Sequence, residues 1–516
     1  MTVRLAALVR HGALAMILLL AAVSRPARPA RAASLCVNPG GTGGCYGLIA
    51  DALAAAGDGD TIRVAGGAPY LERLAITKSI SLIGADPATT ILDGSAAGEV
   101  IRITTSITVT LANLTLRNGQ GPAGSADADT GGGIHNQFGR LTLNNVIVTG
   151  NQSGADASGG ANGGGIANNQ GVLTLVNSLV FNNATASPPD NASGQGAPAG
   201  YGGGIFNANG ALILDHSTVR DNTTGHGGNG TSGGGQGGSG GGVYSAAGSV
   251  LLRSSTIRDN TTGDGGSGGA GGSAGNGGGL GSNHPLITIL NSSLTGNQTG
   301  QGAGPNGSSG SGAGLYLTEG DFPRGASVIS NSTLSGNATG LGLLGNTGGN
   351  GGGLFVQGVP LRMVNDTVAF NDVDSDQSGA GLASDGAVIS LTNSLLAHNI
   401  AGNNIDSVHD CAGSITSLGY NLIMEPDNTC AAAATTGDQF FVGGQIVAPL
   451  ANNGGPTATN ALPPGSPAID AANTSACPAT DQRGLPRPAF GGIELRCDIG
   501  AFELYRFSLG LPLVIK

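Results

Sequence analysis

The sequence predicts an all-β solenoid, in which short strands wind into coils that stack along one axis. Alternating stretches such as 141–143 and 173–175 have a period of two with turn residues at fixed offsets, which is typical of short strands. Successive units start 28–39 residues apart, and only the last segment of each varies in length. This pattern indicates coils that stack to bury their apolar side chains, with loops emerging on one flank. Each unit opens with Gly-Gly-Gly or Gly-Ala-Gly before an aliphatic residue, and the eight aliphatic positions are Ile134, Ile166, Ile205, Val243, Leu280, Leu315, Leu354 and Leu382.

An asparagine follows each aliphatic position by seventeen residues, except in the sixth unit, where five extra residues around 321–324 shift it. The predicted role is a structural ladder of amide hydrogen bonds between stacked coils, and the alternative is a row of ligand contacts. Several of these residues, such as Asn222, also begin an Asn-x-Ser/Thr pattern, which follows from the repeat and is weak evidence for glycosylation. The ladder residues are Asn151, Asn183, Asn222, Asn260, Asn297, Asn337, Asn371 and Asn399.

A second polar position lies eleven residues after most of the aliphatic residues and is again shifted in the sixth unit. Where a histidine stands in this row, at His216, we interpret it as a satisfied side chain at the edge of the core rather than as a ligand. The row consists of Asn145, Asn177, His216, Ser254, Asn291, Asn331, Asn365 and Asn393.

The N-terminus resembles a secretory signal. Residues 1–33 combine an arginine-containing start, the apolar run 13–23 and a small-residue cleavage site at 30–32. The alternative is an uncleaved membrane anchor. No later stretch reaches 18 apolar residues, so the mature chain is predicted not to span a membrane. The signal predicts an extracellular protein, either secreted or attached to the cell surface.

Residues 34–118 are expected to form an N-terminal cap and the first coils. Apolar side chains recur at helical spacing in 46–56, and strand-like runs follow at 61–64, 74–77, 80–83 and 89–92. Because a stack of strands exposes an unpaired edge at its end, the helix is the expected plug. The Gly/Asn-rich repeats then occupy 119–402.

Cysteine usage agrees with export. The six cysteines lie outside the eight repeats as three close pairs, which favours local disulfides in an oxidising compartment. Fifteen connectivities are open, and sequential pairing is the prediction. A metal site is the alternative, but no Cys-x-x-Cys or histidine cluster accompanies them. The predicted pairs are Cys36–Cys45, Cys411–Cys430 and Cys477–Cys497.

Composition limits the partners. The 516 residues include 97 Gly and no Trp, and the net charge is −11. This charge argues against nucleic acid and anionic membranes as partners and fits an acidic protein that could hold cations. The oligomeric state stays open.

Three segments carry a family resemblance. Residues 59–64, 70–72 and 76–84 resemble the opening of bacterial right-handed parallel β-helix proteins of the pectin-lyase-like superfamily. The repeats are also similar to those of chlamydial polymorphic outer-membrane proteins. The resemblance covers roughly 45–400 and implies the right-handed parallel β-helix fold, but it does not fix an activity.

The pattern changes in residues 403–504. The runs 410–423, 450–457, 462–470, 477–484 and 497–503 resemble the choice-of-anchor Q domain of bacterial surface β-helix proteins. A surface-anchoring signal usually follows in that family. Here the short tail 505–516 has neither a Leu-Pro-x-Thr-Gly motif nor a spanning helix, so the mode of attachment stays open.

The search for chemistry identifies no catalytic residue. Polygalacturonases of the superfamily use a Gly-His-Gly with paired aspartates; His226 is flanked by glycines, but no Asp-Asp pair precedes it. Arg220-Asp221 and Arg258-Asp259 occupy equivalent positions in adjacent coils. We interpret them as exposed ion pairs, with a polar binding strip or an acid/base pair as the alternative.

One acidic run is a candidate calcium site. Asp372, Asp374 and Asp376 alternate, so that three carboxylates could surround one hard cation. The run departs from an EF-hand loop, which would have Gly and Glu where Gln377 and Ala383 stand. A solvated acidic loop is the alternative, and no other cofactor is expected.

These observations predict a non-enzymatic, exported β-helix scaffold that contacts an extracellular glycan, matrix or cell-surface ligand, as an adhesin does. The alternative is an extracellular polysaccharide lyase or glycoside hydrolase. Segments between repeats, such as 184–201, 223–239, 261–276 and 298–311, are rich in Gly, Ser, Ala and Asn. They are interpreted as flexible loops that stack poorly on sugars. Because the repeated positions build the coil, these unequal loops are nevertheless the expected place of recognition.

Overall fold

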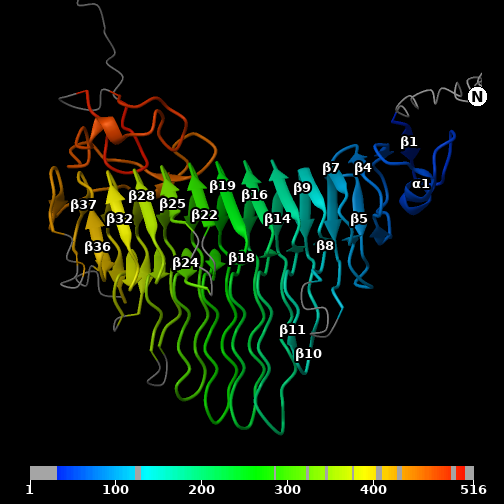
Figure 1. Ribbon diagram of the computed structural model, residues 1–516, viewed down its shortest axis with the longest axis horizontal. Helices are drawn as coiled ribbons and strands as arrows, with labels where there is room; N and C mark the ends of the chain where they lie inside the picture. Colours follow the sequence, from blue (N-terminus) through cyan, green and yellow to red (C-terminus); the bar gives the residue numbers. More distant parts are fainter. Residues whose placement is uncertain are drawn as a thin grey trace, which may run out of the picture.

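The structure is a computed structural model that describes residues 32–122, 130–283, 286–320, 325–342, 347–374, 377–402, 409–426, 430, 433–489 and 495–505. It confirms the all-β fold class: within these ranges, coils of short parallel strands stack along the long axis as a parallel β-helix (Figure 1). The proposed signal peptide 1–33 lies almost entirely outside the described residues, as does most of the tail 505–516.

Each coil contributes three strands, as in β15 (Ile205–Ala208), β16 (Ala211–Asp215) and β17 (Thr218–Arg220). The first strands of the coils form an eleven-stranded parallel sheet in the described part of the chain. Its strands are β3 (Leu74–Ala75), β6 (Ile101–Ile103), β8 (Ile134–Gln137), β12 (Ile166–Asn169), β15, β18 (Val243–Ala246), β21 (Leu280–Ser282), β24 (Leu315–Thr318), β27 (Leu354–Gln357), β31 (Leu382–Asp385) and β35 (Cys411–Ala412).

The second and third strands belong to one larger sheet, in which β7 and β9 span both positions. Its strands are β1 (Ser34–Val37), β2 (Thr61–Val64), β4 (Ile80–Gly84), β5 (Ile91–Asp93), β7 (Thr108–Arg117), β9 (Arg140–Thr149), β13 (Val172–Val176), β14 (Leu179–Phe181), β16, β17, β19 (Ser249–Arg253), β20 (Thr256–Arg258), β22 (Leu286–Leu290), β23 (Ser293–Thr295), β25 (Ser327–Ser330), β26 (Thr333–Ser335), β28 (Leu361–Val364), β29 (Thr367–Ala369), β32 (Ile389–Thr392), β33 (Leu395–Ala397), β36 (Ile415–Ser417), β37 (Leu422–Ile423) and β38 (Gln439–Phe440). Short pairs are β10 (Ala155–Asp156) with β11 (Gly159–Gly160), β30 (Asp372–Val373) with β34 (Ile400–Ala401), and β39 (Leu450–Ala451) with β40 (Thr459–Asn460).

The core is a set of aliphatic columns inside the coils. Leu143, Leu175, Leu214, Leu252 and Ile289 align residue by residue in successive strands, and all five are fully buried. This register confirms the predicted internal column. Because the side chains of a strand alternate between its two faces, one residue of slip would move the column to the outside.

The asparagines at the end of each third strand form a second, polar column. Each Nδ2 donates to the Oδ1 of the next asparagine at 2.8–3.0 Å, from Asn151 to Asn399, and Asn399 donates to Asp410. The backbone N–H groups donate to the same oxygens, and the Nδ2 groups also donate to carbonyls of the preceding coil. The side chains are fully buried, so Asn222 is inaccessible to a glycosylating enzyme in the folded chain.

The second polar row lies at the bend between the second and third strands. Every member has a left-handed backbone, with φ between 48° and 57°. Asparagine tolerates this region better than most residues, which explains why it recurs there. His216 shares the conformation, and its Nδ1 lies 2.7 Å from an oxygen of Asp215.

Helix α1 (Ile49–Ala55) contacts β1 and β2 at the N-terminal end. Both of its ends are held by side chains from the next coil. Glu72 accepts hydrogen bonds from the N–H groups of Ile49 and Ala50 at 2.9 Å, and Lys78 donates to three carbonyls at the C-terminal end. A carboxylate at the first turn and an ammonium at the last complement the helix dipole.

The long segments between coils pack together into one blade, which extends away from the coils in Figure 1. Gly227 and Gly234 donate to carbonyls of the next loop, whereas Gly235 and Gly238 donate to carbonyls of their own loop at 2.8–3.0 Å. These segments are therefore hydrogen-bonded to one another along the blade, which their linker-like composition did not indicate. Glycine is required because the limbs of the loops approach one another too closely for a Cβ atom at many positions.

A C-terminal unit, residues 441–489 and 495–505 (orange and red in Figure 1), packs against β29 and β33 through apolar side chains and against β23 and β26 through hydrogen bonds. Its apolar contact joins Leu395 and Leu422 of the coils to Leu462, Ile499 and Phe502. Below it, the strands β35–β38 continue the coil stack beyond residue 402. The unit also contains a short 3-10 helix, Thr474–Ala476.

The bend asparagines bind this unit directly. Asn331 Nδ2 donates to the Thr480 carbonyl at 2.9 Å, and Asn393 exchanges two hydrogen bonds with the backbone of Asn473. Gln482 is buried and accepts a hydrogen bond from the Thr333 hydroxyl at 2.6 Å. The row that turns the chain in every coil thus becomes a docking surface in the last coils.

Acidic and basic residues of the C-terminal motifs lie inside the unit. Arg483 and Asp481 form an ion pair at 2.6 Å, and Arg487 and Glu503 form another at 3.5 Å, with both side chains of the second pair fully buried. The structure joins the cysteines as Cys36–Cys45, Cys411–Cys430 and Cys477–Cys497. The last bond links the two motif segments of the unit.

Stability is expected to fall as the pH rises from about 4 to about 7. Burial raises the pKa of Asp410 to about 6, and burial together with the charge of Glu503 raises the pKa of Asp498 to about 7. In the unfolded chain both pKa values are near 3.9. The folded state therefore binds these protons more tightly, and the resulting stability is complete below pH 3.9 and is lost as the pH rises through 6 and 7.

For Asp498, the free energy of unfolding should decrease by roughly 2 kcal/mol from pH 5 to pH 7, and by less than about 0.5 kcal/mol from pH 7 to pH 8. Urea titrations followed by circular dichroism at pH 5, 7 and 8 measure this, and Asp498→Asn should flatten the dependence between pH 5 and 7. A wild-type unfolding midpoint that increases over this range would contradict the assignment.

Candidate binding groove

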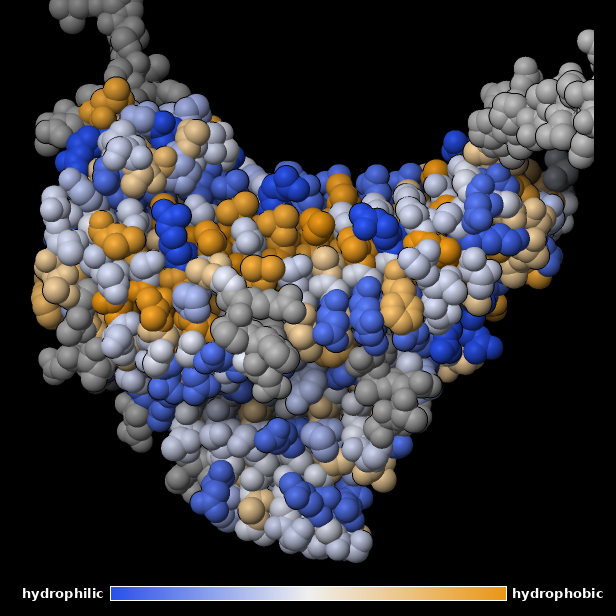
Figure 2. All heavy atoms as spheres, in the orientation of Figure 1, coloured by the Kyte–Doolittle hydropathy of each residue, from blue (hydrophilic) through white to orange (hydrophobic). Residues whose placement is uncertain are grey.

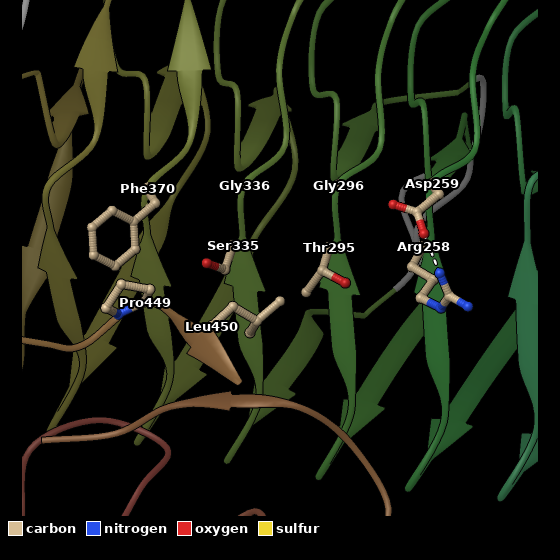
Figure 3. A pocket seen from close by; sticks show the side chains of 9 residues that line it. All are labelled: Arg258, Asp259, Thr295, Gly296, Ser335, Gly336, Phe370, Pro449 and Leu450. Atoms are coloured by element: carbon tan, nitrogen blue, oxygen red, sulfur yellow. Dashed lines mark hydrogen bonds and ion pairs between the residues drawn. The ribbon is translucent and has the colours of Figure 1, made fainter. Parts of the chain in front are cut away.

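A groove of about 520 Å³ lies between the C-terminal unit and the outer ends of the third strands (Figure 3). Four consecutive coils line it with the residues just before their ladder asparagines. The start of β39 lines the opposite side. Figure 3 shows Phe370 and Pro449 at one end, Arg258 and Asp259 at the other, and Leu450 alongside. The lining residues are Arg258, Asp259, Thr295, Gly296, Ser335, Gly336, Phe370, Pro449 and Leu450.

Two glycines make the floor of the groove. The residue before each ladder asparagine has a left-handed backbone, with φ of 54° at Asp259, 65° at Gly296, 68° at Gly336 and 57° at Phe370. The neighbouring coils carry large side chains at this position, whereas Gly296 and Gly336 carry none. Because these two consecutive positions of the row lack side chains, a groove remains between Asp259 and Phe370.

One end of the groove is charged. Arg258 forms an ion pair with Asp259, and the two side chains are 42% and 45% exposed. In the preceding coil Arg220 pairs with Asp221, and its guanidinium lies 4.5 Å from the centre of the Phe181 ring. The two arginines are in register, as the sequence placed them. Each charge is thus compensated within its own coil.

The other end is aromatic. The rings of Phe370 and His398 stack with centres 5.2 Å apart. Burial lowers the pKa of His398, and its Nε2 accepts a hydrogen bond from the Ile446 N–H at 3.3 Å, as a neutral imidazole can. This contact ties the aromatic wall to the C-terminal unit. The unit also supplies Leu450, which is 36% exposed.

The candidate calcium ligands lie elsewhere. Burial raises the pKa of Asp372, and one of its carboxylate oxygens is buried without a hydrogen bond. Asp374 accepts a hydrogen bond from the Gly342 N–H at 2.7 Å. Asp376 lies outside the described residues. Among the residues that are described, no group of three acidic, histidine or cysteine side chains is placed to hold a metal, and calcium binding stays a prediction.

His226 lies in the blade. Its Nδ1 is 3.3 Å from a carboxylate oxygen of Asp264 in the next loop, and this hydrogen-bonded carboxylate raises the pKa of His226. The side chains are 63% and 49% exposed. The pair does not line the groove.

A second cavity, of about 440 Å³, lies near the N-terminal coils and was missed in the sequence. Arg73, Glu99 and Arg102 line it, and behind them His135 Nδ1 is 3.4 Å from Glu99. Glu99 and His135 are each only 7% exposed. These residues come together because the pairing of adjacent coils places Arg102 beside His135. Their spacing in the sequence matches no known motif, so the sequence alone did not predict the cavity.

No family model and no curated protein sequence matches the chain. Solved structures of similar fold include pectate lyase Pel9A, with 13% identity and a TM-score of 0.41, covering 92% of this chain and 96% of that one. They also include XylC in complex with xylose, with 8% identity and a TM-score of 0.50, covering 92% and 98%. These likenesses concern the fold. The resemblances to the choice-of-anchor Q domain and to the chlamydial repeats stay predictions.

Among the described residues, none of the helices combines the length and the apolar composition that a membrane crossing requires.

Proposed function

We propose that this protein is an exported β-helix scaffold that contacts glycans through the groove and does not turn them over. The observation that carries the proposal is the composition of the groove: an aromatic wall, a floor of glycines and small buried hydroxyl side chains, and an ion pair at the far end. An apolar ring face suits the C–H face of a sugar, and the ion pair has spare donors and acceptors for hydroxyl groups. The three disulfides favour an oxidising, extracellular location.

The alternative is an extracellular polysaccharide lyase or glycoside hydrolase. Such an enzyme requires at least one acid and one base that face the same bond. In the described groove lining the carboxylate is Asp259, and it is already paired with Arg258. This arrangement favours binding over proton transfer.

We expect Phe370→Ala to weaken glycan binding at least tenfold, because it removes the aromatic wall. Binding is measured on a glycan array and then by calorimetry with soluble oligosaccharides. Phe441→Ala is the matched control: Phe441 also has a φ of 57°, is 75% exposed and does not line the groove, so its loss should leave binding unchanged.

Two results would sink the proposal. The first is an array without binding above background, or binding that is equal in the wild type and in Phe370→Ala. The second is cleavage of a polysaccharide that is abolished by Asp259→Asn, which would establish the enzymatic alternative.

A further inference from the structure

We infer that the groove selects a neutral, extended glycan and rejects acidic ones. This inference rests on the proposed function and adds the chemical class of the ligand. It follows from the compensation of charges along the groove and from the spacing of the residues that line it.

The charges of the groove leave nothing to attract an anion. Arg258 is the cation of the described lining, and Asp259, the adjacent residue, neutralises it. Arg220 of the preceding coil is neutralised in the same way by Asp221. The chain as a whole carries a net charge of −11, which disfavours the approach of a polyanion at low ionic strength. An acidic polysaccharide would lose hydration and gain no counter-charge here.

A neutral sugar finds partners in the same groups. An arginine has five N–H donors and a carboxylate has several acceptor sites, so one ion pair leaves most of them free for hydroxyl groups. The Arg258 and Asp259 side chains are about half exposed and can be reached. The Thr295 and Ser335 side chains are buried, so the floor between the two ends is smooth.

The length and direction of the groove also suit an extended oligosaccharide. Arg258, Thr295, Ser335 and Ala369 are in register across three coil steps, with Phe370 directly after the last. Coils are about 4.8 Å apart, so the ends of the groove are about 14 Å apart. This length accommodates two or three sugar rings of a chain that runs parallel to the axis of the β-helix. A ring at one end would lie on Phe370, and the hydroxyls of a ring at the other end would meet the ion pair.

Asp259→Asn tests the charge argument, because it leaves Arg258 unpaired without changing the size of the side chain. We expect the wild type to bind neutral hexasaccharides such as xylohexaose, cellohexaose or mannohexaose, and not hexagalacturonate or hyaluronan hexasaccharides. In Asp259→Asn, affinity for an acidic hexasaccharide should increase at least tenfold in 20 mM salt and decrease again as salt is added. The control is Asp51→Asn, which makes the same change in net charge on the exposed face of α1.

The outcomes separate the two proposals. Tight binding of an acidic hexasaccharide by the wild type that is lost in Phe370→Ala overturns the inference and keeps the proposed function. Equal gains in Asp259→Asn and Asp51→Asn also overturn it, because net charge would then suffice. If neither neutral nor acidic hexasaccharides bind in a way that depends on Phe370, the proposed function itself falls.

Discussion

Replacing Gly234 with alanine should destabilise the protein by about 3 kcal/mol, the upper part of the usual range for overpacking. Gly234 lies in the blade, where a Cβ atom would overlap the carbonyl oxygen of Gly266 in the next loop. Its N–H donates to the Ala270 carbonyl at 2.8 Å, so the backbone around Gly234 cannot move away from the next loop without losing this hydrogen bond. Urea unfolding followed by far-ultraviolet circular dichroism measures the effect.

The adjacent Gly233 gives a matched control. A Cβ atom there would lie 3.4 Å from the Ala270 carbonyl oxygen, an ordinary contact, and its φ is not in the left-handed region. Gly233→Ala should therefore change the free energy of unfolding by less than about 1 kcal/mol. Equal and small effects of the two substitutions would mean that the loops are as flexible as their composition indicates.

Asn260→Ala should cost roughly 3 kcal/mol, because it breaks the asparagine column at its centre. The Asn260 side chain accepts hydrogen bonds from the backbone and the side chain of Asn222, and it donates to Asn297 and to the Val219 carbonyl. All these partners are buried, so water cannot replace the lost bonds.

The control for this experiment is Asn144→Ala, which removes an exposed asparagine from β9. Its unfolding midpoint should match that of the wild type. An unchanged midpoint in Asn260→Ala would show that the column contributes nothing to stability.

The coils could be predicted from the sequence because their determinants recur. The aliphatic residue, the bend residue and the ladder asparagine keep fixed spacings, so the register of Leu143, Leu175 and Leu214 follows from aligning the units. The blade could not be predicted in this way. Its composition is that of a flexible linker, and the hydrogen bonds that order it join loops that become neighbours only after the coils have stacked.

The groove could not be predicted from the sequence either, for two reasons. Gly296 and Gly336 resemble many other glycines of the repeat, and their importance comes from standing between Asp259 and Phe370 in space. The wall formed by Leu450 depends on docking contacts such as Gln482 with Thr333, which are 149 residues apart. Long-range contacts of this kind leave no periodic signal.

The asparagine column has a direction. Every hydrogen bond from one ladder amide to the next points toward the C-terminal end of the axis, so these amide dipoles add head to tail and polarise one another. At the last step the acceptor is Asp410, a carboxylate rather than another amide. The two ends of the β-helix are therefore electrostatically inequivalent, even where their coils have the same shape.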